Sequence, residues 1–96
     1  MKKHIEIKLK ATSLKKGFGF AVYKFAIENH LTGSLSYISD NTSLIKIEGA
    51  VTSITACVGW CIQCIDSYGI CEINIKPEAV KHYDQFIIIN TLNNLK

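Results

Sequence analysis

The 96-residue sequence is long enough for one domain with a single core. Its composition, 48% hydrophobic and 20% charged, is typical of a globular chain and excludes a disordered one. The formal charge of +3 comes from eleven lysines without any arginine, which excludes the two-point phosphate contacts of an arginine fork. No apolar run approaches the roughly 18 residues of a membrane helix. Because charged residues also interrupt the N-terminal MKKHIEIKLK where a signal peptide stays apolar, we expect a cytoplasmic protein.

A strand and then a helix are predicted for the first thirty residues. Ile5, Ile7 and Leu9 alternate with charged residues, which is the period of a strand with one buried face. Residues 13–17 are polar and end in glycine, which indicates a loop. From there the spacing becomes helical, and the helix should end near His30. Its apolar face is expected to hold Phe18, Val22, Phe25, Ala26 and Asn29.

A hairpin and a second helix are predicted for the middle of the chain. Residues 35–39 and 44–48 have the composition of strands, and Asp40-Asn41 between them suits a tight turn. After Gly49 the apolar spacing is helical again. The residues of this stripe are Val51, Ile54, Val58, Cys61, Ile62 and Ile65.

The last part of the chain is predicted to add a turn at residues 66–69 and two strands. Residues 71–76 alternate and should form a strand that Pro77 stops, and residues 86–89 form the last strand. The order β-α-β-β-α-β, with the last strand split or followed by an extra one, predicts an α+β, ferredoxin-like sandwich. It has one antiparallel sheet of four to five strands with two helices on one face. The domain should cover residues 1–90, and residues 91–96 should form a frayed C-terminal tail.

Several stretches of the chain resemble the acylphosphatase family. Residues 13–19 are similar to that family's loop V-Q-G-V-G-F-R, and residues 31–41 are similar to its hairpin L-x-G-x-V-x-N-x-x-D-G. Further matches are Glu48-Gly49, Trp60 and Tyr83-x-x-Phe86-x-Ile88. The resemblance covers nearly the whole chain, mostly at core and turn positions.

The resemblance implies hydrolysis of carboxyl-phosphate bonds, but this sequence departs from the family at both catalytic positions. In the family, loop N–H groups and the loop's final arginine hold the phosphate, and an asparagine places the attacking water. Gly19 stands at the arginine position and Tyr37 at the asparagine position. Sliding the loop by two residues would put Ala21 at the arginine position, which is no better.

We therefore predict an inactive relative without catalytic residues. Its degenerate loop should bind phosphate or sulfate weakly, or a partner. The residues of this loop are Leu14, Lys15, Lys16, Gly17, Phe18 and Gly19. Weak anion binding stays open because Lys15 or Lys16 could supply the missing positive charge. An active acylphosphatase is the alternative.

A second resemblance is local. Residues 16–23, KGFGFAVY, are similar to the RNP1 octapeptide of RNA-recognition motifs, whose aromatic residues stand on a strand and stack bases. RNP1 lies on the third strand of that fold, whereas only about fifteen residues precede the segment here. Nucleic acid is therefore the less favoured partner.

The cysteines, histidines and tryptophan are assigned no catalytic or metal-binding role, and no cofactor is expected. The spacing of Cys57, Cys61 and Cys64 is known from iron–sulfur sites, but on a helix these residues pack as small hydrophobes, and Cys71 should share a core-facing side of its strand.

Helical geometry places Trp60 off the apolar stripe. If Trp60 is exposed, the second helix should carry a homodimer contact.

Overall fold

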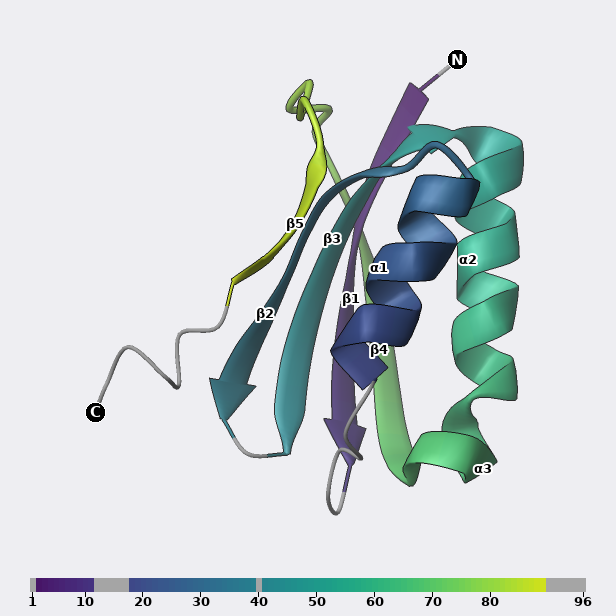
Figure 1. The fold of residues 1–96 in the computed structure, drawn as a ribbon, viewed down its shortest axis with the longest axis vertical. Helices are drawn as coiled ribbons and strands as arrows, with labels where there is room; N and C mark the ends of the chain where they lie inside the picture. The colour runs from purple at the N-terminus through teal and green to yellow at the C-terminus, as the bar shows by residue number, and fades with distance from the viewer. Residues whose placement is uncertain (1, 12–17, 40, 90–96) are drawn as a thin grey trace.

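Five strands form one sheet in the order β4-β1-β3-β2-β5, and two longer helices cover one of its faces (Figure 1). The computed structural model describes residues 2–11, 18–39 and 41–89. The elements are β1 Lys2–Ala11, α1 Phe18–Glu28, β2 Thr32–Ser39, β3 Thr42–Ala50, α2 Val51–Gln63, α3 Ile65–Tyr68, β4 Ile70–Glu78 and β5 Phe86–Ile89. Among the described residues, no helix is both long and apolar enough to cross a bilayer.

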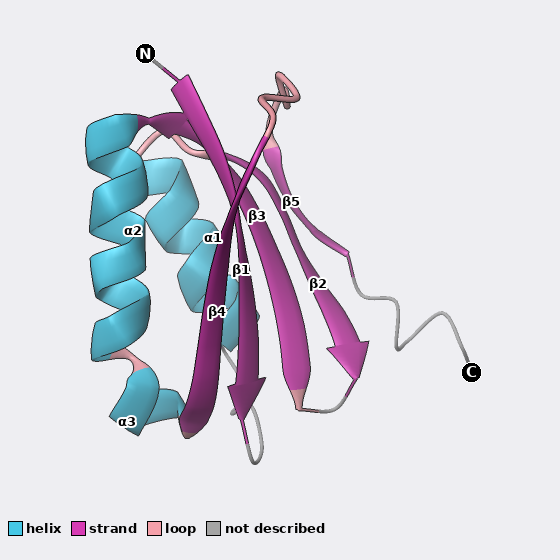
Figure 2. Ribbon diagram, turned by 180° about the vertical axis from the view of Figure 1, so that it is seen from behind, coloured by secondary structure: helices cyan, strands magenta, loops and turns pink. Residues whose placement is uncertain are grey.

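The ferredoxin-like α+β fold predicted from the sequence is confirmed. Strand β1 lies between β3 and β4 and is antiparallel to both, and β2 is antiparallel to β3. The extra strand β5 runs parallel to β2, which makes the sheet mixed. Figure 2 shows α1 and α2 together on one side of the sheet, and no described helix lies against its second face.

The core lies between the sheet and the helices. The predicted alternation of apolar and charged residues in β1 is confirmed, because Ile5, Ile7 and Leu9 are all buried. Leu35, Ile45 and Ile47 lie on the same face of the neighbouring strands. Helix α1 contributes the predicted buried residues Phe18, Val22 and Ala26.

The buried face of α2 differs from the predicted stripe. Val51, Ile62 and Ile65 are exposed, and the buried residues of this segment are Ile54, Cys57, Cys61 and Cys64. The apolar arc of the sequence is thus wider than the arc that the sheet covers, and the small thiol side chains occupy the covered part. Core packing of these three cysteines is confirmed.

Strand β4 contains two corrections. Cys71 is exposed rather than packed in the core, because the register shifts between Lys10 and Ala11 where β1 meets the start of β4; its thiol donates a hydrogen bond to the Lys10 carbonyl over 3.3 Å. Pro77 does not stop the strand but pairs with Ile5 inside it. An edge strand accepts proline, since one side of its backbone needs no partner.

The predicted turn at residues 66–69 is instead the short helix α3. It ends at Gly69, whose φ of 66° lies in the left-handed region that favours glycine. Trp60 is partly buried and stacks on Phe25, with ring centroids 5.1 Å apart and planes 25° apart. The condition under which Trp60 would mark a dimer contact is therefore not met.

The chain must cross the end of the sheet between β4 and β5, which lie at opposite edges, and one buried carboxylate holds this crossover. Glu48 on β3 is fully buried and accepts backbone N–H groups from three successive residues: Lys81 at 2.5 Å, His82 at 3.1 Å and Tyr83 at 2.9 Å. The left-handed φ of 61° at His82 accompanies this curl of the backbone. The crossover then delivers Gln85, whose carbonyl accepts the Gly33 N–H, to the start of β5.

Burial and hydrogen bonding act on the Glu48 carboxyl in opposite directions. Desolvation raises its pKa, but the three backbone N–H groups and the positive charge of Lys2 together hold the pKa below its usual value. Glu48 is therefore ionised at neutral pH although it is buried.

Removing this carboxylate should destabilise the protein strongly. We expect Glu48→Ala to lower the free energy of unfolding by about 3 kcal/mol, because it leaves three partly buried N–H groups without their acceptor, and Glu48→Gln to cost about 1–3 kcal/mol. Urea unfolding followed by circular dichroism measures both. Glu28→Gln, at an exposed position of α1, is the control and should change stability by less than about 0.5 kcal/mol.

The same carboxylate should make stability depend on pH. Because the folded pKa of Glu48 lies below its unfolded value, its contribution is complete above the unfolded pKa and is lost as the pH falls through the folded pKa. Wild-type protein should thus lose more stability than Glu48→Gln between pH 7 and about pH 3. Parallel losses in the two proteins would contradict the assigned role of Glu48.

Candidate functional site

The two positions that the acylphosphatase resemblance marks as catalytic lie against each other. Gly19 is in the first turn of α1 and is buried, and Tyr37 is on β2, beneath the start of the helix. A Cβ placed on residue 19 would overlap the Tyr37 hydroxyl and would lie 3.8 Å from a methyl group of Leu35. The tyrosine hydroxyl thus fills the space in which any side chain at position 19 would begin.

The Tyr37 hydroxyl is neutral at physiological pH. Burial raises its pKa, and a hydrogen bond with the Gly19 backbone acts in the opposite direction without reversing the shift. The pair therefore brings one neutral hydroxyl to the place where the family has a cation and an amide.

The structure describes only part of the predicted anion-binding loop. Leu14, Lys15, Lys16 and Gly17 lie outside the described residues. Phe18 is buried in the core, where its ring meets that of Tyr68 edge to face at 5.1 Å. Phe18 thus supports the fold at this position.

The RNP1-like segment does not have the geometry that its similarity to the RNP1 sequence suggests. Phe18 and Phe20 lie on helix α1, one 1% and the other 67% exposed, rather than side by side on a strand. The pair cannot offer the flat stacking surface of an RNA-recognition motif.

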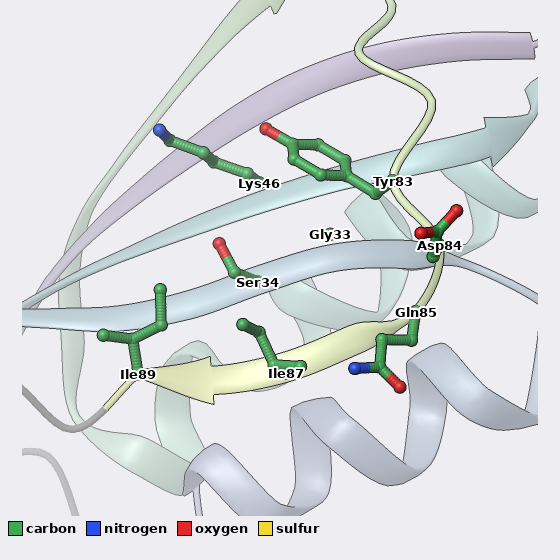
Figure 3. A pocket seen from close by; sticks show the side chains of 8 residues that line it. All are labelled: Gly33, Ser34, Lys46, Tyr83, Asp84, Gln85, Ile87 and Ile89. Atoms are coloured by element: carbon green, nitrogen blue, oxygen red, sulfur yellow. The ribbon is translucent and has the colours of Figure 1, made fainter.

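A second candidate site, which the sequence did not reveal, lies on the open face of the sheet. It is a shallow hollow of about 440 Å³ between β3, β2, β5 and the end of the crossover, and Figure 3 shows its lining side chains. They are Gly33, Ser34, Lys46, Tyr83, Asp84, Gln85, Ile87 and Ile89. The hollow offers both charges and several hydrogen-bonding groups. Gly33 and Tyr83 carried a signal in the sequence, as parts of the hairpin match and of the C-terminal family match.

The thiols of α2 form a buried cluster of their own. The hydrogen bond between them lowers the pKa of Cys57 and raises that of Cys61, which burial raises further. Within the described ranges, no three His, Cys, Asp or Glu side chains are grouped so that they could hold a metal ion.

Comparison with solved structures places the fold beside the acylphosphatases. The chain superimposes on an acylphosphatase from Coxiella burnetii with a TM-score of 0.80 and 20% identity, over 92% of this chain and 93% of that one. An acylphosphatase from Bacillus subtilis superimposes with a TM-score of 0.76 and 17% identity, over 93% of this chain and 99% of that one. Full-length HypF, in its phosphate- and nucleotide-bound form, superimposes with a TM-score of 0.76 and 24% identity over 93% of this chain. The match covers only 12% of the HypF chain.

The chain thus has an acylphosphatase-like fold. No family model and no curated protein matches the sequence. The structural likeness, at these identities, concerns the fold and leaves the chemistry to the residues themselves.

Two helical glycines allow the contact between Gly19 and Tyr37 to be measured. A Cβ on Gly59 in α2 would meet nothing within 4 Å, so Gly59→Ala should stabilise the protein by about 0.5–1 kcal/mol. Gly19→Ala should gain the same stabilisation from the helix backbone, but its Cβ collides with the Tyr37 hydroxyl. The substitution should therefore be less favourable than Gly59→Ala by about 1–3 kcal/mol of unfolding free energy. Urea unfolding measures the difference.

The matched double variant isolates the hydroxyl. In a Tyr37→Phe background most of the penalty of Gly19→Ala should disappear, because the nearest remaining ring atom is 3.5 Å from the new Cβ. An unchanged penalty would mean that Tyr37 does not occupy this space.

Proposed function

We propose that this chain is an acylphosphatase-fold binding module that does not hydrolyse carboxyl-phosphate bonds. The observation that carries the proposal is the contact of Tyr37 with Gly19 at the two positions where the family has its arginine and asparagine. A tyrosine seated on the glycine leaves no room there for a cationic side chain, and its neutral hydroxyl cannot replace one.

The size of the expected loss supports this proposal. Hydrolysis in this family depends on positioning and on stabilising negative charge in the transition state, and one lost donor typically costs about 10²–10³ in rate. The chain contains no arginine that could act from elsewhere. Lys46, on β3, lines the hollow on the open face of the sheet (Figure 3), whereas Gly19 lies in α1 on the other face.

The binding role falls to the loop before α1. Lys15 and Lys16 keep two positive charges next to the start of a helix, where backbone N–H groups favour an anion. We propose weak binding of phosphate or sulfate there, in a cytoplasmic protein.

An assay with benzoyl phosphate tests the absence of hydrolysis. The purified protein should release phosphate no faster than buffer, while the Bacillus subtilis acylphosphatase serves as the active control. Turnover within the ordinary enzymatic range of about 1–10³ s⁻¹ would overturn the proposal and make the chain an active acylphosphatase.

Thermal unfolding in phosphate tests the binding role. At 10 mM phosphate, a site with a dissociation constant of about 1 mM should stabilise the fold by about 1.4 kcal/mol relative to chloride at equal ionic strength. The double variant Lys15→Gln/Lys16→Gln should lose this effect, whereas Lys24→Gln, at an exposed position of α1, should keep it. If phosphate stabilises neither the wild type nor the Lys24→Gln control, the loop does not bind it.

A further inference from the structure

Strand β4 is an edge strand whose apolar side chains are only partly covered. It lies at one end of the sheet, and within the described part of the chain it pairs with β1 alone. Ile73 is half-buried and Ile75 is 45% exposed, although both face the helix side of the sheet. An exposed edge of this kind presents unpaired backbone N–H and C=O groups to any strand that can align with it.

An apolar groove continues from this edge onto the helices. It has a volume of about 370 Å³ and runs between β4 and the end of α2, where Ile62 is 54% exposed, and α3, where Ile65 is 36% exposed. Ile62 and Ile65 are the residues of the predicted apolar stripe that lie outside the buried face of this helical segment. Apolar surface that gathers beside a free strand edge is typical of an interaction site.

We propose that a second copy of this chain occupies the β4 edge, with the two β4 strands antiparallel about a two-fold axis at Asn74. The charge pattern of the strand itself supports this pairing. In this register Glu72 of each copy faces Lys76 of the other, and Ile73 faces Ile75. Opposite charges and β-branched pairs directly across two strands stabilise the pairing.

The neighbouring registers lack this match. Side chains directly opposite each other in two paired strands lie on the same face of the sheet, and side chains alternate between the faces along a strand. The two-fold axis must therefore pass through a residue and cannot pass between two residues. An axis at Ile75 would set Glu72 against Glu78, and an axis at Ile73 would leave Glu72 facing Asn74. Of these three registers, only the one at Asn74 sets both charges opposite a residue of the other sign, in addition to the contact of Lys76 Nζ with Glu78 Oε2 of its own chain at 3.1 Å.

The geometry also brings the apolar groove into the interface. A two-fold axis perpendicular to the sheet keeps the helices of both copies on the same side, so the grooves with Ile62 and Ile65 meet above the joined strands. The nine-residue strand offers an edge of about 30 Å. Pro77 lies opposite Cys71, where its missing N–H costs one donor at each end of the pairing.

The charges allow a direct test by sedimentation velocity between about 10 µM and 1 mM, a range suited to a weak dimer. Wild type should approach twice the 10.7 kDa mass of the chain as its concentration rises. Glu72→Lys alone and Lys76→Glu alone each place like charges in both cross-strand pairs, and each should weaken the dimer about tenfold. An equimolar mixture of the two variants should form a heterodimer, because every pair is again opposite in sign.

A second pair of variants tests the groove. Ile62→Gln on α2 should weaken the dimer about tenfold or more, whereas Ile27→Gln, a helical isoleucine that is 49% exposed on α1, should leave it unchanged. Thermal unfolding of every variant verifies that the monomer is folded. A monomer at all concentrations would overturn the proposal and leave the edge to another partner. A dimer that neither charge variant nor Ile62→Gln weakens would overturn this interface.

Discussion

The crossover from β4 to β5 depends on a carboxylate in a place where burial alone would exclude a charge. Glu48 has no contact with water, and it stays ionised because three consecutive backbone N–H groups replace its hydration. The same bonds satisfy a segment that belongs to neither strand nor helix and that must nevertheless cross the sheet. Glu48 thus holds the end of the crossover, together with His4, whose Nδ1 lies 2.7 Å from the Ala79 carbonyl oxygen and whose ring meets that of Tyr83 edge to face.

The fold was predictable from periodicity, but the faces of its elements were less so. Ile5, Ile7 and Leu9, and the helix that begins at Phe18, follow local spacing that one core dictates, and the structure confirms them. In α2 the apolar residues extend around more of the helix than the sheet covers. Which part of that arc is buried depends on where the sheet ends, and local spacing contains no information about that edge.

The interactions that the sequence could not reveal join residues far apart in the chain. Nothing near Glu48 indicates that it binds backbone groups more than thirty positions away, and Pro77 acts as a strand residue only because β4 is at an edge. The candidate site was predicted through a family resemblance, which aligned Gly19 with an arginine and Tyr37 with an asparagine. The alignment could not show that the second residue fills the space left by the first. The two departures from the family therefore have a common steric basis.

The parallel pairing of β5 with β2 has a consequence for the order in which the sheet assembles. Strands β1 to β4 can pair among themselves as soon as β4 has been made, but β2 then still has one free edge. Because β5 follows all other strands in the chain, that edge stays open for the whole interval in which the crossover is synthesised and bound by Glu48. Vectorial synthesis thus leaves the β2 edge open to pairing with other chains until β5 covers it, whereas the outer edge of β4 stays open in the finished sheet.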